Sequence, residues 1–382
     1  MNKHINFTYL SILILASLTA CESNETPIQH ADNYNYITFS AQTEKITRAN
    51  PYEAYDPTKH PVQMGVFGYH DISTYDALTR AGSTPAANPI FDNEMVNYNT
   101  SSKNWESISH QLWDSYKGAT TFDFFGYMPR TEAAELTRTA MDTYTLSIPF
   151  SMPAADHLLF DTKQAPIICA LPEHKEGTSA EGDQFTFERE VKLQFDQTLT
   201  AYRLLFKLDP KMGAIRQFRI KGVNLTGDIA TSGTINRTYH WANRAWKADD
   251  IKWTNITKES FADTPIPIPY QAASSTTSDG SQTTVITSAD FTQWGPVCYM
   301  IPDTKFEPTI SVTYDVELIA EDGSTVITRK DVTSAITLNK NNFSGLTTGK
   351  TAMIYPIRIL IQPRYLYVLG DDDAYTGHLL ID

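Results

Sequence analysis

Cysteine is scarce in this sequence, and its scarcity excludes a fold held together by disulfide bonds. Only 3 of the 382 residues are cysteine, and Cys21 lies directly after the leader segment described below. Cys169 and Cys298 remain, each among apolar neighbours. We expect two buried free thiols, with a bridge between the two halves of the chain as the alternative. Apolar packing must therefore hold the fold together.

Motifs that mark enzymes are also lacking. There is no His-Glu-x-x-His zinc motif, no Gly-x-Ser-x-Gly nucleophile turn and no glycine-rich phosphate loop. The nine histidines are scattered, and we expect His174, beside a carboxylate, to be a solvated surface residue. The acidic run 371–373 lacks the spacing of a calcium loop. The sequence therefore predicts a protein that is not an enzyme and needs no cofactor or metal.

Positive charge is in deficit as well. Lys and Arg number 31 against 44 Asp and Glu, which gives a net charge of −13. Such a chain repels polyanions unless it carries a local basic stripe, and the sequence contains none. Nucleic acid is therefore excluded as a partner.

The apolar run at the N-terminus is too short to span a bilayer. Residues 9–18 are apolar, whereas a transmembrane helix needs roughly 20 such residues. The run follows Lys3 and leads through Leu-Thr-Ala into Cys21, which is the pattern of a secretory signal peptide with a bacterial lipobox. We expect residues 1–20 to be removed, Cys21 to carry the lipid, and residues 21–35 to be a lipidated tether to the outer membrane.

What the sequence has in abundance is short β-prone segments. Apolar and polar residues alternate in the segments 36–41, 62–69, 121–127, 144–148 and 202–208. This period of two is the one that a half-buried strand needs. Segment 310–332 predicts a hairpin that turns at Asp322 and Gly323. We predict a mainly β fold with β-sandwich architecture.

The length suits two domains. The run 173–183 is polar and contains two glycines, so we place the boundary there. This predicts an N-terminal β-sandwich domain at 36–172 and a C-terminal one at 185–382. The stretch 273–284 is rich in Ser and Thr and is expected to be a surface loop within the second domain.

Trp241, Trp246 and Trp253 lie in one stretch of the sequence. They could form a platform on which sugar rings stack, but strands favour aromatic residues for packing. We expect them in the core or at its rim. A glycan-binding surface remains the alternative.

The two terminal strands point to a function. The first, with Ile37, Phe39 and Ala41 on one face, precedes Arg48 and Ala49, a site for an arginine-specific protease; Arg80 is a rival site. Near the C-terminus, residues 353–361 are long, apolar and β-prone. An exposed apolar strand must be paired, covered or donated to another sheet. A cut after Arg48 would release the first strand and open an apolar groove.

These motifs, in this order, resemble the fimbrillin family of Bacteroidetes, the type V pilins. The lipobox and first strand are followed by Met-Gly-Val-Phe-Gly-Tyr at 64–69, Phe-Asp-Phe-Phe-Gly-Tyr at 122–127 and Asp-His-Leu-Leu-Phe at 156–160. The strand at 193–200 is similar to the family's, with Gln197 where histidine is common. The resemblance covers most of the mature chain.

The resemblance implies two transthyretin-like β-sandwich domains in tandem and a precursor trimmed by an arginine-specific protease between Arg48 and Ala49. The removed segment would be 36–48, and the donor-strand region would be 350–382. The side chains of the donor strand would be Met353, Tyr355, Ile357, Ile359 and Ile361.

The implied partners are other fimbrial subunits through strand exchange, outer-membrane lipid through Cys21, the protease, and a host or bacterial surface ligand. The chain would be a structural subunit of a cell-surface fimbria with a role in adhesion. The sequence leaves open whether it is a stalk, tip or anchor subunit. The alternative function is an outer-membrane lipoprotein that binds glycans without polymerising.

Overall fold

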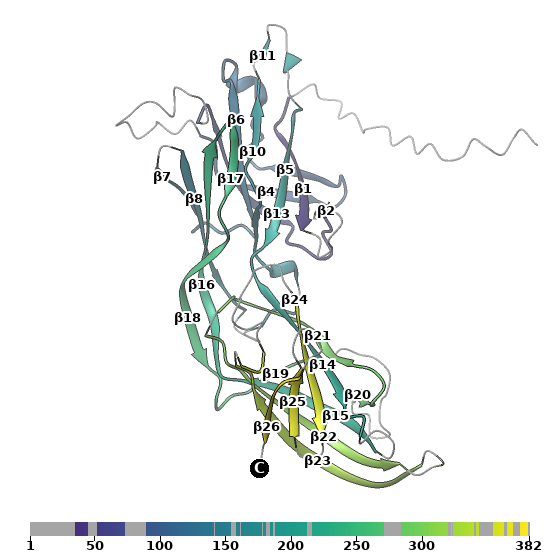
Figure 1. Ribbon diagram of the computed structural model, residues 1–382. Helices are drawn as coiled ribbons and strands as arrows, with labels where there is room; N and C mark the ends of the chain where they lie inside the picture. The colour runs from purple at the N-terminus through teal and green to yellow at the C-terminus, as the bar shows by residue number, and fades with distance from the viewer. Residues whose placement is uncertain are drawn as a thin grey trace, which may run out of the picture. The chain divides into compact units, whose positions relative to one another are not determined.

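The structure is a computed structural model of the chain (Figure 1). It describes residues 35–44, 52–72, 89–140, 142–153, 158–160, 162–177, 179–180, 184–185, 188–211, 216–270, 284–303, 305–319, 322, 324–339, 341–343, 354–362, 365–369 and 375–380. Tyr36–Asp382 forms one compact unit. No helix among these described residues has the length and apolar character needed to cross a membrane.

The described strands form four larger sheets and one small hairpin. The first sheet contains β1 (Thr38–Glu44), β2 (Tyr52–Ala54), β3 (Gln63–His70), β4 (Pro89–Asn99), β5 (Asn104–Ser107), β6 (Thr121–Met128), β9 (Ile167–Cys169), β10 (Glu173–Glu176) and β13 (Glu190–Gln197). The second contains β7 (Glu135–Ala140), β8 (Thr143–Ser151), β16 (Asp228–Ala242), β17 (Ala245–Ala248) and β18 (Lys252–Ser260).

The other sheets are built from later parts of the chain. The third contains β14 (Thr200–Leu208), β21 (Thr292–Met300), β24 (Ile354–Gln362), β25 (Tyr365–Leu369) and β26 (Tyr375–Leu380). The fourth contains β15 (Arg216–Thr226), β19 (Ile266–Pro267), β20 (Thr284–Ile286), β22 (Thr309–Ile319) and β23 (Thr325–Thr337). The hairpin is β11 (Ser179–Ala180) with β12 (Gln184–Phe185), and two short 3₁₀ helices are η1 (Trp113–Tyr116) and η2 (Thr162–Gln164).

The mainly β prediction is confirmed. Each of the five alternating segments contributes a strand, namely β1, β3, β6, β8 and β14. The predicted hairpin is β22 paired antiparallel with β23. The strands follow from the sequence because alternate side chains are buried, as in β8, where Tyr144, Leu146 and Ile148 are buried and the residues between them are not. The finer assignment to tandem transthyretin-like domains stays a prediction.

The first core lies between the first and second sheets. Phe125 of β6 is fully buried. Its ring meets those of Tyr144 on β8, Tyr239 on β16 and Trp246 on β17, at centroid distances of 5.8, 5.4 and 5.4 Å. Tilted and edge-to-face contacts of this kind add about 0.5–1.5 kcal/mol each beyond area burial. The two sheets are therefore joined by aromatic rings.

The second core lies between the third and fourth sheets. Phe206 on β14 and Ile359 on β24 are fully buried in it, together with Phe218 on β15 and Val312 on β22. The side chains come from strands far apart in the sequence, so the core forms only when the whole second half of the chain has folded.

The two cores do not divide the chain at a single point. Leu193 and Phe195 on β13 and Tyr239 on β16 belong to the first core, although they follow residue 185. Leu158, which precedes 172, belongs to the second core. The polar run 173–183 provides β10, which pairs with β6. The domain boundary between 172 and 185 stays a prediction, and later strands complete the first pair of sheets.

A buried carboxylate holds β10 and β17 against β6. Asp123 on β6 is 0% exposed. Its Oδ1 accepts a hydrogen bond from Trp246 Nε1 at 2.7 Å and lies 2.7 Å from His174 Nδ1. The His174 ring also packs on Trp241, at 4.6 Å between centroids. His174 therefore differs from the expected solvated histidine, because the strand β10 turns it toward a buried acid.

The tryptophans of the 241–253 stretch pack as expected. Trp241 and Trp246 are 8% and 6% exposed, and they lie directly opposite each other on β16 and β17. Trp253 Nε1 donates to the Thr198 carbonyl at 2.8 Å. The three rings are thus part of the packing between elements and do not form an exposed platform.

The two cysteines are free and buried, so the alternative of a bridge between them is wrong. Cys169 Sγ lies 3.0 Å from Tyr239 Oη, and the Tyr239 hydroxyl donates to the Cys169 carbonyl at 2.8 Å. Arg237 donates to the same carbonyl and pairs with Asp196 at 2.6 Å. Burial raises the pKa of the Cys169 thiol and raises that of Cys298 to about 12.

Gly65 marks a place where only glycine fits. A Cβ at this position of β3 would lie 2.4 Å from the Tyr127 ring. The ring cannot turn aside easily, because its hydroxyl lies 2.6 Å from Asn93 Oδ1 and 2.7 Å from the Thr131 carbonyl. A Cβ added at Gly222 on β15 would have no heavy atom within 4 Å. Gly222 therefore offers a matched control.

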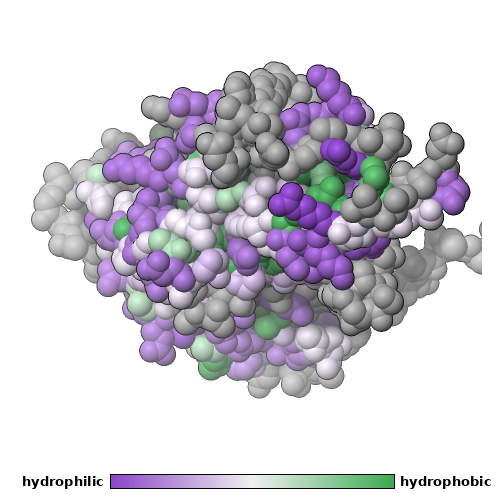
Figure 2. Space-filling model, turned by 90° about the horizontal axis from the view of Figure 1, so that it is seen from below, coloured by the Kyte–Doolittle hydropathy of each residue, from purple (hydrophilic) through white to green (hydrophobic). Residues whose placement is uncertain are grey.

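The face of the molecule seen in Figure 2 is mostly hydrophilic, with smaller hydrophobic areas between. Over the described residues, the large hydrophobic side chains that are exposed are Tyr36, Val62, Ile108 and Leu171. The apolar faces of the strands are therefore covered in this state of the chain.

We expect native protein with Cys21→Ser to resist 5,5′-dithiobis(2-nitrobenzoate) at pH 8. Both remaining thiols are buried, and their raised pKa values keep them protonated. In guanidinium chloride, two thiols per chain should react, as followed by absorbance. Rapid reaction of a native thiol, or fewer than two reactive thiols after unfolding, would contradict the described packing.

Gly65→Ala should destabilise the protein by about 1–3 kcal/mol through overpacking, whereas Gly222→Ala should change the free energy of unfolding by less than about 1 kcal/mol. Urea unfolding measures both as a shift in midpoint. Equal effects of the two substitutions would show that the Tyr127 ring yields to the added methyl group.

Candidate strand-exchange site

The first strand closes a ring of paired strands. In the first sheet the order runs β6, β3, β4, β5, β1, β13 and β9, and β9 pairs back onto β6. β1 lies between β5 and β13. Neither edge of β1 is therefore an open edge, and its removal would interrupt the ring.

The two sides hold β1 differently. Toward β13 the pairing is parallel and continuous, from Thr38 opposite Glu190 to Thr43 opposite Phe195. On the opposite side the pairing is antiparallel and divided among three contacts. Phe39 pairs with Trp105 on β5, residues 42–44 pair with β2, and Tyr36 forms a bridge with Leu112, beside which the Ile37 N–H donates to the Gln111 carbonyl at 2.9 Å. The link to β13 is thus one continuous ladder, whereas the opposite side is held by short separate segments.

The inward face of β1 is apolar. Ile37, Phe39 and Ala41 are 3%, 3% and 7% exposed, while the alternate residues face outward. The Phe39 ring lies 5.7 Å from that of Phe91 and 6.2 Å from that of Phe124. Fully burying one such side chain contributes about 1.5–3 kcal/mol. The structure therefore brings the three predicted residues of the removed strand together on one buried face.

The processing and lipidation residues fall outside the described part of the chain. Arg48 and Ala49 belong to the segment 45–51, which joins β1 to β2 in the sequence. Cys21 and the rival site Arg80 also lie outside the described residues. Their roles stay predictions. The end of β1 is described as far as its pairing with β2, where Thr43 lies opposite Glu53.

The predicted donor strand is β24. Tyr355, Ile357, Ile359 and Ile361 are 5%, 3%, 0% and 0% exposed and point into the second core. Met353 lies outside the described residues. β24 pairs parallel with β14 and antiparallel with β25. In this state the donor-strand residues are therefore used within their own chain.

β1 and β24 occupy equivalent positions. β13 and β14 follow each other directly in the sequence, and each has one parallel neighbour: β1, the first described strand, for β13, and β24, which precedes β25 and β26, for β14. Each of these parallel neighbours buries alternate side chains. Both strands thus pair in parallel with a central strand and bury alternate side chains. The buried side chains of β24 (Tyr355, Ile357, Ile359 and Ile361) are on average larger than those of β1 (Ile37, Phe39 and Ala41).

Sequence reasoning did not identify the strands that border the first strand. The alternating residues of β13 predict a strand, but nothing in them names β1 as its partner across about 150 residues. Trp105 on the short strand β5 was likewise missed. Parallel pairing carries no turn signal in the sequence, because parallel strands need a long connection.

A search of the described residues finds no group of three or more His, Cys, Asp or Glu that could hold a metal ion. Apart from Asp56, whose pKa is lowered to about 2 by hydrogen bonds from Thr58, the groups with large pKa shifts are buried or half-buried tyrosine and cysteine side chains. Tyr239, whose pKa burial raises well above its usual value, belongs to the Cys169 network.

Phe39→Ala should destabilise the protein by about 3–5 kcal/mol, because it leaves a cavity between Phe91 and Phe124. Thr38→Ala, on the exposed side of the same strand, should cost less than about 1 kcal/mol. Urea unfolding compares the two. Similar losses would mean that the strand is held by backbone pairing and not by the inward side chains.

Solved structures of bacterial surface proteins are similar to this chain. A fimbrial protein from Bacteroides vulgatus ATCC 8482 aligns at 14% identity over 90% of this chain and 98% of its own, with a TM-score of 0.50. Provisionally assigned cell adhesion proteins from Bacteroides ovatus and Bacteroides uniformis align at 13% and 12% identity. They cover 92% and 87% of this chain and 100% and 95% of their own, with TM-scores of 0.42 and 0.37.

No family model matches the sequence, and no curated protein matches it. The predicted resemblance to Bacteroidetes fimbrial proteins is confirmed at the level of the fold. By its fold, the chain is similar to a fimbrial protein of Bacteroides.

Proposed function

We propose that the chain is a structural, non-catalytic subunit of a cell-surface fimbria, assembled by strand exchange and with a role in adhesion. It is exported as a lipoprotein precursor that is attached to the outer membrane through Cys21. An arginine-specific protease cuts between Arg48 and Ala49, and the trimmed chain joins other subunits in the fimbrium.

The observation that carries this proposal is the place of β1. An interior strand with Ile37, Phe39 and Ala41 buried leaves an apolar slot behind when it departs. On the β13 side of the slot, the main-chain groups of residues 190–195 lose their partners. Unpaired buried main-chain groups cost free energy, so the emptied slot binds another strand.

The order of the chain supports the processing step. Cys21 precedes β1, and Arg48 follows it. A cut at Arg48 therefore separates the rest of the chain from the lipid and from β1 in one reaction. Segment 45–51 also links β1 to β2, so β1 is then held by non-covalent contacts alone.

The replacing strand comes from the region 350–382 of another subunit. Within that region, β24 has the inward pattern of Tyr355, Ile357, Ile359 and Ile361. It is a parallel partner of β14, as β1 is of β13. A strand in the slot gains a ladder of main-chain hydrogen bonds, with alternate side chains in apolar pockets.

Limited digestion of the unlipidated Cys21→Ser precursor with an arginine-specific protease tests the proposal. We expect one early cut at Arg48, seen by intact mass, and then a ladder of oligomers in size-exclusion chromatography. Arg48→Gln should resist the cut and stay monomeric. Arg80→Gln is the matched control and should behave like the parent chain.

Trimmed protein that stays monomeric, or a first cut at Arg80, would contradict strand exchange through β1. If the trimmed chain also kept β1 in place, the glycan-binding lipoprotein that does not polymerise would become the better account.

A further inference from the structure

The outward face of the second sheet carries an uncharged polar ladder. On β8 and β16, Thr145 Oγ1 lies 3.1 Å from Thr238 Oγ1, and Ser147 donates to Asn236 Oδ1 at 2.8 Å. Asn236 in turn donates to Thr254 on β18 at 2.8 Å. These hydroxyl and amide groups satisfy one another and leave little capacity for a ligand.

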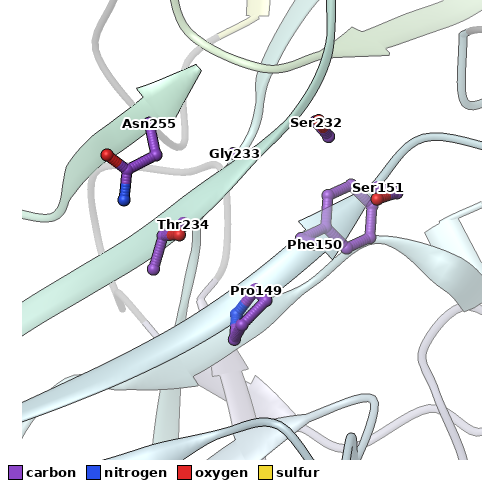
Figure 3. Close-up of a pocket in the computed structure, with 7 residues that line it drawn as sticks. All are labelled: Pro149, Phe150, Ser151, Ser232, Gly233, Thr234 and Asn255. Atoms are coloured by element: carbon purple, nitrogen blue, oxygen red, sulfur yellow. The ribbon is translucent and has the colours of Figure 1, made fainter. Parts of the chain in front are cut away.

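At the end of this ladder the surface is hollowed. The hollow has a volume of about 270 Å³. It is lined by Pro149, Phe150, Ser151, Ser232, Gly233, Thr234 and Asn255, from the three neighbouring strands β8, β16 and β18 (Figure 3). Its volume lies just below the ~300 Å³ at which sites for drug-sized ligands begin. It therefore suits one small ring.

An irregularity in strand pairing shapes the hollow. Ser232 lies opposite Thr257 and Thr234 opposite Thr254, so two residues of β18 face the single residue Gly233. Asn255 is one of the two. It is exposed, with φ of 52°, and Figure 3 shows its amide extending toward Thr234. The bulge thus places an amide beside the hydroxyls of β16, as bulges commonly re-aim side chains.

The floor behind the hollow is fixed. A Cβ at Gly233 would lie 3.0 Å from the Trp253 ring, so glycine lets β16 approach that ring closely. Trp253 is held by its hydrogen bond to the Thr198 carbonyl and packs edge-on against Phe150, with 6.1 Å between ring centroids. The lining groups are therefore presented by a rigid support.

The polar side chains around the hollow are available to bind a ligand. In the portion of the chain that the structure describes, the side chains of Ser151, Ser232, Thr234 and Asn255 make no hydrogen bond to another protein group. This distinguishes them from the ladder. Together they offer three hydroxyls, one amide donor and one amide acceptor, with no charged side chain in the lining.

We propose that this hollow binds one neutral sugar residue of a surface glycan. A pyranose ring has a hydroxyl edge that the amide and hydroxyls can bond, and an apolar C–H face that can pack on Pro149, which lies on the same outward face as Ser151 and Thr234. The absence of charge in the lining disfavours acidic sugars, which would lose hydration without gaining a counter-charge. A neutral sugar would be the class of ligand for the adhesion role. This rests on the proposed function, which places the chain at the cell surface.

A single site of this size binds weakly. Repetition of the site along a fimbria raises the overall avidity by about 10²–10⁴ when several sites engage one glycan. A sugar site that binds weakly on one subunit would therefore bind strongly when the subunit is repeated along a fimbria.

Saturation-transfer NMR on the monomeric Cys21→Ser precursor tests the proposal. The probes are the methyl α-glycosides of glucose, galactose and mannose, with glucuronic acid as the charged comparison. We expect saturation transfer to at least one neutral probe and less to glucuronic acid. Asn255→Ala and Thr234→Val should each raise the dissociation constant by about fivefold, the value of one net hydrogen bond.

Thr145→Val, on the same face but away from the hollow, is the matched control and should leave the dissociation constant unchanged. Urea midpoints confirm that all variants fold. No transfer to any neutral probe, or transfer that Asn255→Ala and Thr234→Val leave intact, would overturn the proposal. Because the assay uses the uncut monomer, its result is independent of whether the trimmed chain polymerises.

Discussion

The parallel pairing of β1 with β13 is the constraint on which the first half of the structure depends. It joins residues 38–43 to residues 190–195 and closes the ring of strands in the first sheet. The side chains of Phe39 and Leu193 then lie in one core. Because β1 is an interior strand, it is paired on both sides within the first sheet.

This arrangement also sets the order in which the fold becomes complete. The first core needs Leu193 of β13 and Tyr239 of β16 as well as Phe125 of β6. Contacts between residues so far apart in the sequence form slowly. The chain must lose the entropy of closing a long loop before the contact can stabilise the fold. The first core is therefore completed only once β13, β16 and β17 have joined the earlier strands.

The sequence predicted the strands well and their partners poorly. The segment 121–127 forms a strand, β6, as predicted, but all of its residues are buried. The alternation predicted a half-buried strand, and this part of the prediction is wrong, because β6 is covered on both faces. The choice of β13 as neighbour of β1 rests on packing across the whole ring, which no local pattern records. The polar run 173–183 predicts a domain boundary, yet its first residues, 173–176, form β10. Lys175 is buried there and pairs with Glu173, and His174 meets the buried Asp123, so tertiary contacts outweigh the polar composition.

The parallel ladder between β1 and β13 has a mechanical consequence. A pull along the strand axis loads every hydrogen bond from Thr38 to Thr43 at the same moment, which is shear, whereas a pull across the strands opens them one after another, which is unzipping. Shear needs more force than unzipping for the same bonds. A strand seated in this slot would therefore resist tension along its own axis and still yield to a pull across the sheet.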